Sequence, residues 1–493
     1  MTYLLAIDQG TSSSRAIVFN DKGENCGVHH ISIQQYYEHN GWVEHDADEI
    51  WQTTVACCIE AIKAANITAT DIAAIGITNQ RETSVIWDKK TGEPIYRAIV
   101  WQDRRTADFC KTLSQDKHIV KRVSDKTGLL IDPYFSATKI KWILDNVPHA
   151  RHRAERGELA FGTIDTFLLW RLTNGNHFYT DVTNASRTLL FNIHTLAWDD
   201  ELISLFDIPK KILPTVLDSN AYFGVTEKSL FGVEIPIHGM AGDQQAATIG
   251  QGCFKRGMIK STFGTGAFIV LNTGDDVIHS QHHLLSTIAY RINGAVTYAL
   301  EGSIFSAGAS IKWLHENISL LHAPSECEKI CSDIVDTNGV YFVSAFTGLG
   351  APYWDPDARA AIFGITRDTQ KSHLVRAALE SVCYQTVDLI RAMQADFSYP
   401  LETLQVDGGM SKNNWLLQFL SDMLALPVKR PRCVETTALV AAFLAGLGVG
   451  VFNDLEDIAK QIKQDRAFSP MMTDQKRDAF YAGWCDAIAR VIK

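Results

Sequence analysis

The sequence lacks the short motifs that mark several large enzyme classes. A Gly-Lys dipeptide does not occur, which excludes the P-loop by which many proteins hold nucleotide phosphates. Neither a His-Arg-Asp loop nor an Asp-Phe-Gly tripeptide occurs, which excludes a protein-kinase fold. The chain also has neither a Gly-x-Ser-x-Gly elbow nor a His-Glu-x-x-His motif, and this disfavours the common serine hydrolases and zinc proteases.

Paired cysteines and long apolar runs are missing as well. The 10 cysteines are scattered without a Cys-x-x-Cys pair, so a structural zinc site is not expected. No charged and then apolar leader opens the sequence. The longest uncharged stretch, 436–453, is short and interrupted by glycines, which predicts a buried helix and a turn rather than a membrane span. Reduced thiols and no export signal lead us to expect a cytoplasmic protein.

The composition is that of a globular protein with more than one domain. Its 493 residues far exceed a typical domain of ~150 residues. Hydrophobic residues make up 46% and charged residues 21%, which excludes a disordered chain. The net charge of -10 does not favour a general electrostatic grip on nucleic acid or on an anionic membrane, although it leaves room for local basic patches.

The first half of the chain opens on a strand, a polar turn and a second strand. Residues 3–7 and 15–19 are apolar and flank the polar segment 8–14. The next predicted elements are a strand at 28–33, a helix at 48–65, and strands at 72–77 and 84–87. The more polar stretch 110–215 is interpreted as an insertion that carries substrate contacts.

The second half repeats this opening. Residues 258–262 and 267–271 are apolar and flank a turn of glycine and threonine at 263–266. The later predicted elements are strands at 296–300, 340–343 and 403–406 and helices at 373–395 and 416–423. Two halves that begin in the same way predict duplicated α/β domains, 1–250 and 251–493, with a cleft between them.

The first polar turn has the donors that a polyphosphate requires. Backbone N–H groups, the hydroxyls of 11–14 and the cation of Arg15 lie close together in the sequence. Asp8 ends an apolar strand, where its carboxylate is suited to face a magnesium ion. The alternative is an ordinary polar hairpin turn.

Two further glycine turns occur in the second half. The turn 264–266 is a weak signal alone, but it lies on the equivalent strand–turn–strand, so the two turns are expected to face each other across the cleft. The segment 407–409 ends a strand just before a helix, and Asn413 is suited to contact ribose or phosphate. The alternative is an ordinary strand-to-helix turn with Ser411 as the N-cap. Phosphate turns on hairpins in both halves favour an ATPase of the actin and hexokinase type.

Two segments contain the residue types needed for chemistry on a hydroxyl group. Asp243 follows a glycine-rich turn and opens an alanine-rich helix, where its carboxylate either caps the helix or accepts a proton from a substrate hydroxyl. Arg81 and Glu82 follow the strand 72–77. Arginine donates and ionised glutamate accepts, so this pair can bracket the vicinal hydroxyls of a polyol. The alternative is a solvent-exposed ion pair.

The chain resembles the FGGY family of carbohydrate kinases over residues 5–484. The matching segments are 8–15, 78–83, 134–146, 243–245, 360–380 and 407–409. The segments 184–188 and 346–354 resemble in particular those members that phosphorylate glycerol. The resemblance implies two duplicated actin/hexokinase-like (ribonuclease H-like) α/β domains with the active site in the cleft between them. It also implies transfer of phosphate from ATP, with Mg²⁺, to glycerol, which gives sn-glycerol 3-phosphate and ADP.

The resemblance also implies roles for single residues. The family's aspartate that matches Asp243 is the base that takes the hydroxyl proton. The residues that match substrate contacts are Arg81, Glu82, Trp101, Tyr134, Asp243, Gln244 and Phe268. The residues that match nucleotide contacts are Thr11, Ser12, Ser13, Arg15, Thr265, Gly308, Gly409 and Asn413. Asp8 matches a carboxylate near the magnesium ion, and we expect Asp243 at the same ion. Lys312 stands where related enzymes often carry glutamine, and a cation there can still meet phosphate or ribose.

Regulation and assembly are expectations from the same resemblance. The loop 227–234 lacks the glycine-rich, arginine-bearing sequence on which some members bind a sugar bisphosphate, so feedback by fructose 1,6-bisphosphate is not expected. Family members form dimers and tetramers, and one of these is expected. The alternatives to phosphorylation of glycerol are a kinase for another short polyol or ketose and, in a different class, an actin- or chaperone-like ATPase that acts as a binding module.

Overall fold

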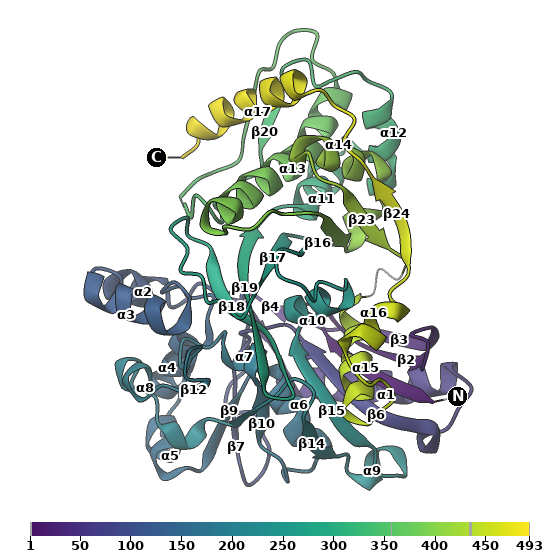
Figure 1. Ribbon diagram of the computed structural model, residues 1–493. Helices are drawn as coiled ribbons and strands as arrows, with labels where there is room; N and C mark the ends of the chain where they lie inside the picture. Colours follow the sequence, from purple (N-terminus) through teal and green to yellow (C-terminus); the bar gives the residue numbers. More distant parts are fainter. Residues whose placement is uncertain (1, 356, 433–435, 493) are drawn as a thin grey trace.

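Two β-sheets, one in each lobe, form the framework of the protein (Figure 1). The computed structural model describes residues 2–355, 357–432 and 436–492. The strands of the lower sheet in Figure 1 follow the order β14 (Tyr222–Val225), β15 (Pro236–Gly242), β6 (Ile72–Asn79), β1 (Tyr3–Gln9), β2 (Ser13–Asn20) and β3 (Asn25–Ser32). The strands of the upper sheet follow the order β18 (Leu285–Ile292), β19 (Ala295–Ile304), β17 (Ala267–Gly274), β16 (Ile259–Phe263), β22 (Leu404–Asp407), β23 (Val428–Pro431) and β24 (Gln464–Phe468).

The centres of the two sheets repeat one pattern. In the lower sheet, β1 pairs antiparallel with β2 and parallel with β6. In the upper sheet, β16 pairs antiparallel with β17 and parallel with β22. The α/β fold with two duplicated domains, predicted from the repeated strand–turn–strand, is therefore confirmed.

Helices cover both faces of the lower sheet. Helix α1 (Ala47–Ala64) packs against β2 and β3, and helix α15 (Thr436–Gly448) packs against β1, β6 and β15. Because neither face meets water, β1 and β6 are almost wholly buried and their sequences are apolar on both sides. The helix predicted at 48–65 is confirmed to within one residue at each end.

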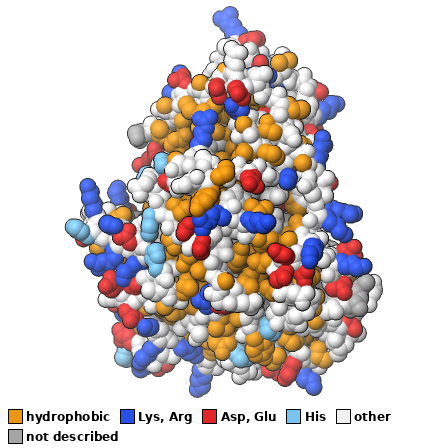
Figure 2. All heavy atoms as spheres, viewed as in Figure 1, with side chains coloured by type: hydrophobic (Ala, Val, Ile, Leu, Met, Phe, Trp, Pro, Cys, Tyr) orange, Lys and Arg blue, Asp and Glu red, His pale blue; other side chains and the backbone are white. Residues whose placement is uncertain are grey.

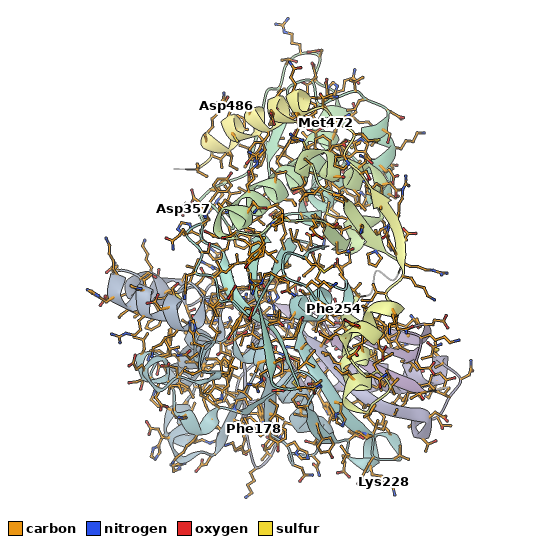
Figure 3. The ribbon with its side chains drawn as sticks, viewed as in Figure 1. Phe178, Lys228, Phe254, Asp357, Met472 and Asp486 are labelled. Carbon is orange, nitrogen blue, oxygen red and sulfur yellow. The ribbon has the colours of Figure 1, made fainter. Side chains whose placement is uncertain are left out.

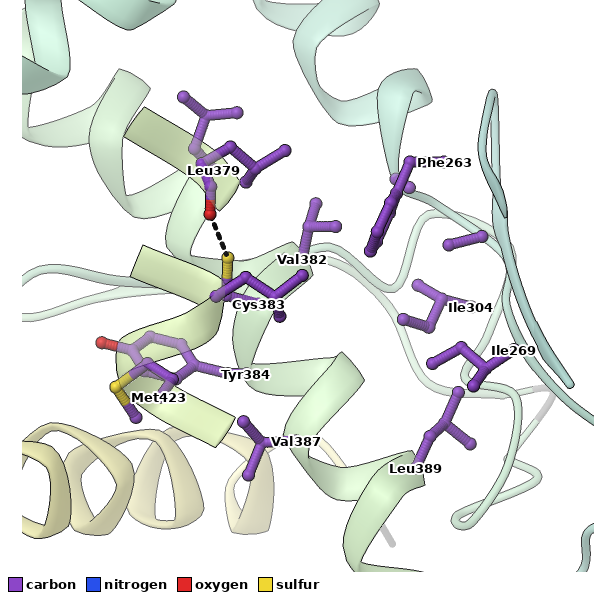
Figure 4. Close-up of a cluster of buried hydrophobic side chains, with 14 of the residues drawn as sticks. Phe263, Ile269, Ile304, Leu379, Val382, Cys383, Tyr384, Val387, Leu389 and Met423 are labelled. Carbon is purple, nitrogen blue, oxygen red and sulfur yellow. Dashed lines mark hydrogen bonds between the residues drawn. The ribbon is translucent and has the colours of Figure 1, made fainter. Parts of the chain in front are cut away.

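The upper sheet packs on a long buried helix, α13 (Lys371–Asp396) (Figure 4). Val382 and Leu389 of α13 belong to the same hydrophobic cluster as Ile269 of β17 and Ile304 of β19. The apolar stripe of the sequence predicted this helix at 373–395, and the structure adds one turn or less at its ends. Helix α14 (Asn414–Leu424) packs against α13 and against β23 and β24 of the same sheet.

Helix α15 comes from the second half of the chain but completes the core of the first sheet. It is buried along its length and is followed by Gly450 with a positive φ of 76°, so the uncharged stretch 436–453 is a buried helix and a turn, as predicted. Phe254, labelled in Figure 3, packs against two hydrophobic clusters. One cluster joins α15 to the first sheet, and the other contains residues of both α15 and α10 (Asp243–Gly250). The chain therefore crosses between the lobes more than once. The boundary between the two domains at residue 250 stays a prediction.

The remaining elements lie around the two sheets. Between β6 and β14 the chain forms β7 (Val85–Asp88), β8 (Ala98–Ile99), α2 (Ala107–Leu113), α3 (Lys117–Thr127), α4 (Ser136–Asn146), α5 (Ala150–Arg156), β9 (Leu159–Gly162), α6 (Ile164–Leu172), β10 (Tyr179–Asp181), α7 (Val182–Ala185), β11 (Phe191–Asn192), β12 (Ala197–Trp198), α8 (Asp200–Leu205) and β13 (Thr215–Leu217). The other elements are β4 (Gln35–Tyr36), β5 (Glu44–His45), α9 (Lys228–Phe231), α11 (Gly308–Glu316), α12 (Cys327–Ser332), β20 (Tyr341–Val343), β21 (Ala361–Phe363), α16 (Leu455–Gln461) and α17 (Asp474–Ala489). Acidic and basic side chains are interspersed over the face drawn in Figure 2. None of the helices in the described ranges combines the length and the apolar character that crossing a membrane requires.

Candidate active site

The parallel strands of the lower sheet end side by side, and this brings the acidic residues of the site to one edge. Asp8 of β1 pairs with Thr78 of β6, and Thr78 pairs with Ala241 of β15. Asp243 follows two residues later, as the first residue of α10. Two strand spacings put the Cα atoms of Asp8 and Ala241 about 10 Å apart. Residues distant in the sequence therefore meet at the carboxyl edge of this sheet.

Asp243 is placed to accept a proton. The N-cap of α10 is Gly242, so the alternative that Asp243 caps the helix is wrong. Its Oδ1 lies 3.3 Å from Nε of Arg81 and accepts a hydrogen bond of 2.7 Å from the backbone N–H of Gln244. Burial raises the pKa of Asp243 to about 6, although the charge of Arg81 opposes this rise. A carboxylate with such a pKa is half ionised near pH 6 and serves as a general base above it.

Arg81 and Glu82 form a buried charged pair behind Asp243. Both are almost fully buried, with exposed side-chain fractions of 2% and 1%, so the alternative of a solvent-exposed ion pair is wrong. Glu82 has a φ of 59°, in the left-handed region, which turns the chain sharply after β6. Nη2 of Arg81 lies 3.3 Å from the hydroxyl of Tyr134. The structure thus brings together Arg81, Glu82, Tyr134 and Asp243.

Three aromatic rings line the same space from both lobes. The ring of Trp101 meets that of Tyr134 edge-on at 5.6 Å between centroids and that of Phe268 at 6.2 Å. Phe268 lies on β17 of the upper sheet, so Trp101 reaches across the cleft. Its indole N–H donates a 2.9 Å hydrogen bond to Oγ1 of Thr11 in the first polar turn. Apolar ring faces next to charged groups suit a small polyol, which has both hydroxyls and a carbon backbone.

The first polar turn joins β1 and β2. The N–H of Gly10 donates to the backbone oxygen of Ser13 over 2.9 Å, which closes the turn, and Ser12 is exposed at its tip. Arg15 forms an ion pair with Asp8 at 2.5 Å. The cation and the carboxylate predicted to contact phosphate and metal therefore lie against each other in this structure.

The second glycine turn meets the start of a helix. The N–H groups of Ala307 and Gly308 donate to the backbone oxygens of Thr265 and Gly264 at 2.9 and 3.0 Å. Thr265 and Gly308, both predicted to contact phosphate, therefore lie together at the end of β16. Lys312 is on the same helix, α11, one turn further along. Its side chain is 68% exposed and lies 3.7 Å from the carboxylate of Glu316.

The third glycine turn follows β22, the neighbour of β16. A Cβ on Gly408 would lie 2.5 Å from the backbone oxygen of Phe263, and its φ is 85°, so this position requires glycine. Among the described residues, no heavy atom lies within 4 Å of the place where Gly409 would carry a Cβ, which leaves room for a flat ligand. The N-cap of α14 is Asn413, whose side chain accepts from the N–H of Leu416, so the alternative in which Ser411 is the N-cap is wrong.

The donor set at the lower edge fits a divalent metal that is bound mainly by phosphate. Within the described residues, no group of three His, Cys, Asp or Glu side chains could hold a metal ion. Mg²⁺ typically takes only one or two carboxylates and fills its other positions with water and substrate phosphates. Asp8 and Asp243 at one sheet edge meet that requirement, and in the described part of the chain the buried Oγ1 of Thr78 between them has no hydrogen-bond partner.

Four charged residues of the site were missed in the sequence. Glu301 and Lys260 lie in strands of the upper sheet, and Arg187 and Lys139 lie in the insertion, all fully buried. For Glu301 and Lys260 the available signal was a single charge inside an apolar strand, because a charge is rarely buried without a partner. Their partners come from segments 100 or more residues away in several cases, and no local pattern identifies these.

Comparison with known proteins settles the family. Residues 3–250 match the N-terminal domain of the FGGY family of carbohydrate kinases, and residues 259–449 match its C-terminal domain. The chain belongs to the FGGY family of carbohydrate kinases. As in other members, ATP is the phosphate donor and a divalent metal accompanies it.

Relatives of this FGGY kinase cover its whole length. It is 56% identical to a glycerol kinase of Coxiella burnetii over 491 residues, which is 100% of this chain and 98% of that protein. It is 57% identical to glycerol kinase 1 of Pseudomonas aeruginosa, covering 99% of both chains. The crystal structure of Plasmodium falciparum glycerol kinase with ADP superposes with a TM-score of 0.94 at 39% identity, covering 100% of this chain and 99% of that one. A gluconate kinase from Lactobacillus acidophilus, at 20% identity and a TM-score of 0.89, shares the fold.

Proposed function

We propose that this FGGY kinase is a glycerol kinase, which transfers the terminal phosphate of ATP to glycerol and forms sn-glycerol 3-phosphate and ADP in glycerol catabolism. Identity of 54–57% to glycerol kinases over essentially the whole chain carries this conclusion. The geometry agrees, because a carboxylate with a raised pKa, a buried Arg–Glu pair and three aromatic rings meet in one place.

In the proposed reaction, Asp243 is the general base. The hydroxyl oxygen of glycerol attacks the terminal phosphorus, a new O–P bond forms, and the bond from that phosphorus to the bridging oxygen of ADP breaks. The proton of the attacking hydroxyl passes to the carboxylate of Asp243, and the bridging oxygen keeps the electron pair. Such a transfer depends mostly on positioning and on stabilisation of charge.

Each part of the polyol has a matching group in the site. Arg81 donates to hydroxyl oxygens and Glu82 accepts from hydroxyl hydrogens, while Tyr134 and Gln244 complete the polar contacts. Burial of the charged pair favours glycerol over a deoxy analogue, because a missing hydroxyl would leave a charged group without its partner. The carbon backbone packs on the rings of Trp101 and Phe268.

The nucleotide is proposed to bind between the glycine turns. Thr11, Ser12, Ser13 and Arg15 would contact phosphate from the lower lobe, and Thr265 and Gly308 from the upper lobe. Adenosine would lie against Gly409 and Asn413, and Lys312 would reach its ribose or phosphate. Mg²⁺, held by Asp8 and Asp243 together with phosphate oxygens, would neutralise charge that develops on the phosphates. Closure of the lobes over glycerol would exclude water, a competing acceptor.

We further propose a cytoplasmic location and a homodimer or homotetramer. The cysteines in the described part of the chain are free thiols, most of them buried, which supports a reducing compartment. Size-exclusion chromatography with light scattering measures the oligomeric state.

The test is ADP release in a coupled assay with glycerol, dihydroxyacetone, xylulose and gluconate, each with and without Mg²⁺. We expect the highest kcat/KM for glycerol and no turnover after chelation of the metal. Activity on a ketopentose without activity on glycerol would move the enzyme to another branch of the family. ATP hydrolysis that no polyol changes would instead indicate an ATP-driven binding module.

A further inference from the structure

Glu301 connects the upper sheet to the charged residues of the polyol site. It lies on β19 and is fully buried. Its Oε2 accepts a 2.6 Å hydrogen bond from Nη1 of Arg81, and its Oε1 accepts one of 3.0 Å from Nη2 of the same guanidinium. Oε1 also accepts a 2.9 Å hydrogen bond from Nη2 of Arg187. One carboxylate of the upper lobe therefore holds two arginines of the lower lobe.

The two-point contact fixes which way the Arg81 guanidinium faces. A guanidinium is planar, and its donors point in fixed directions. Nη1 and Nη2 each direct one N–H at Glu301, and they also donate to Oε1 of Gln245 at 3.1 Å and to the hydroxyl of Tyr134 at 3.3 Å. Nε faces the carboxylates of Asp243 at 3.3 Å and Glu82 at 3.8 Å. The residue proposed to bind glycerol is thus oriented from behind by Glu301.

Arg187 links Glu301 to Glu82 by hydrogen bonds to both carboxylates. Its Nε donates a 2.6 Å hydrogen bond to Oε1 of Glu82, while its Nη2 is held by Glu301. The guanidinium also lies 5.5 Å from the ring centroid of Tyr134 and 5.2 Å from that of Phe135, within cation–π range. Glu301 therefore reaches the second charged residue of the substrate pair through Arg187.

The four buried charged side chains of this network, two arginines and two glutamates, balance in charge. Removal of one charge would therefore leave a buried opposite charge without its partner. Arg81 and Arg187 carry two positive charges, and Glu82 and Glu301 carry two negative charges, all with side chains 2% exposed or less. Burial alone raises the pKa of Glu301, but the charges of Arg187 and Arg81 outweigh burial and lower it to about 2. Glu301 stays ionised at any working pH, and its removal would leave two buried cations short of an acceptor.

We infer that Glu301 is a positioning residue for the polyol site, supplied by the upper lobe, which orients Arg81 and Arg187 so that the Nε side of Arg81 and the carboxylate of Glu82 face the substrate. This inference rests on the proposed function, because it names a determinant of that same site. It also implies that the polyol site is complete only when β19 is seated against the lower lobe.

The test compares Glu301→Gln and Glu301→Asp with the wild-type enzyme. The Gln variant keeps the shape and loses the charge, and the Asp variant keeps the charge but withdraws it by one methylene group. For Glu301→Gln we expect the KM for glycerol to rise roughly 10- to 100-fold while the KM for ATP changes less than threefold. The preference for glycerol over propane-1,2-diol should fall by a similar factor. The Asp variant should lie between Gln and wild type.

Leu300→Ala is the matched control. Leu300 is the preceding residue of β19, is fully buried, and belongs to the hydrophobic cluster on the other side of the strand. Its truncation should lower the melting temperature without changing the KM for glycerol or the preference against the deoxy analogue. This comparison separates loss of stability in β19 from loss of orientation at the site.

The result that overturns the inference is a folded Glu301→Gln enzyme with the wild-type KM for glycerol and the wild-type preference. A variant whose KM values for ATP and glycerol rise equally overturns it as well, because that is the behaviour of general structural damage. If the Gln variant does not fold, the inference is tested on the Asp variant, by its KM for glycerol and its preference for glycerol over propane-1,2-diol. The wild-type substrate panel is measured first: if another polyol is the substrate, the proposed function fails, and the same comparison is made with that polyol.

Discussion

Lys260 of the upper sheet donates a 2.5 Å hydrogen bond to Oε1 of Gln244, the residue that follows Asp243 on α10. Its ammonium group also donates to Oγ1 of Thr262 at 3.1 Å. Lys260 is fully buried, and burial lowers its pKa to about 8, although Asp407 and Glu301 oppose this effect. A cation from one lobe is thus held against the helix of the other lobe that carries the proposed base.

Replacement of Lys260 by Met should impair the reaction more than the binding of nucleotide. The side-chain amide of Gln244 would lose its partner, and the positive charge that stabilises ionised Asp243 would be removed. We expect kcat/KM for glycerol to fall by roughly 10-fold or more, since a hydrogen bond to a charged group contributes about 1.5–3 kcal/mol. Isothermal titration with ADP should give a dissociation constant close to that of the wild type. Unchanged glycerol kinetics would contradict this role.

Replacement of Asp243 by Asn should stop the chemical step. An amide does not accept the hydroxyl proton, so kcat should fall by roughly 10²- to 10⁴-fold, the usual contribution of a general base. The melting temperature and the affinity for ADP should change little. Asp275→Asn is the control, because Asp275 is 85% exposed and forms an ion pair with Arg256 at the surface. Near-normal turnover of the Asp243 variant would place the base elsewhere.

The rate should depend on pH through Asp243. Burial raises its pKa to about 6, Arg81 and Lys260 lower it, and Glu82 raises it. The base is active when deprotonated, so kcat is retained above pH 6 and falls about tenfold per pH unit below it. Initial rates at saturating glycerol and Mg–ATP over pH 4.5–8.5 measure this limb. In the residual activity of Asp243→Asn the limb should be absent.

The sequence predicted the scaffold of the site better than its charges. The three glycine turns could be located because strands, turns and glycines leave local patterns, and strands predicted at 72–77 and 403–406 are found within two residues. Glu301 and Lys260 could not be assigned, since their partners come from the opposite lobe. The location of α15 on the first sheet is equally invisible to local pattern, because an apolar helix can pack on either sheet.

Lys139 should hold the loop that carries Tyr134. Its buried ammonium group donates to the backbone oxygens of Pro133, Tyr134 and Phe135 at 2.9, 2.5 and 3.1 Å. In Lys139→Met these buried oxygens lose their donor, at a cost of about 1–3 kcal/mol for each group left unsatisfied. We expect a lower midpoint in urea and a raised KM for glycerol.

Lys141→Met is the control for Lys139→Met. Lys141 lies two residues further along α4 and forms surface ion pairs with Asp145 and Asp207, at 3.0 and 3.7 Å. Exposed ion pairs contribute about 0–1 kcal/mol, so this control should unfold close to the wild type and keep its KM. Equal behaviour of the two variants would show that the contacts of Lys139 with the loop do not matter.

Gly76 should be required for the packing of α15 on the first sheet. A Cβ at Gly76, in the middle of β6, would lie 1.8 Å from the backbone oxygen of Ala441 on α15. Backbone cannot move aside as a flexible side chain can, so Gly76→Ala must push the helix away from the sheet. Overpacking of this kind typically costs about 1–3 kcal/mol, and the close approach here puts Gly76→Ala at the upper end or above it.

Gly409→Ala is the control, because its Cβ would meet no described heavy atom within 4 Å. Because a protein with two lobes need not unfold in one step, the first urea midpoint, followed by far-UV circular dichroism, is the quantity to compare. A Gly76→Ala midpoint equal to that of Gly409→Ala would mean that α15 does not pack this closely in solution.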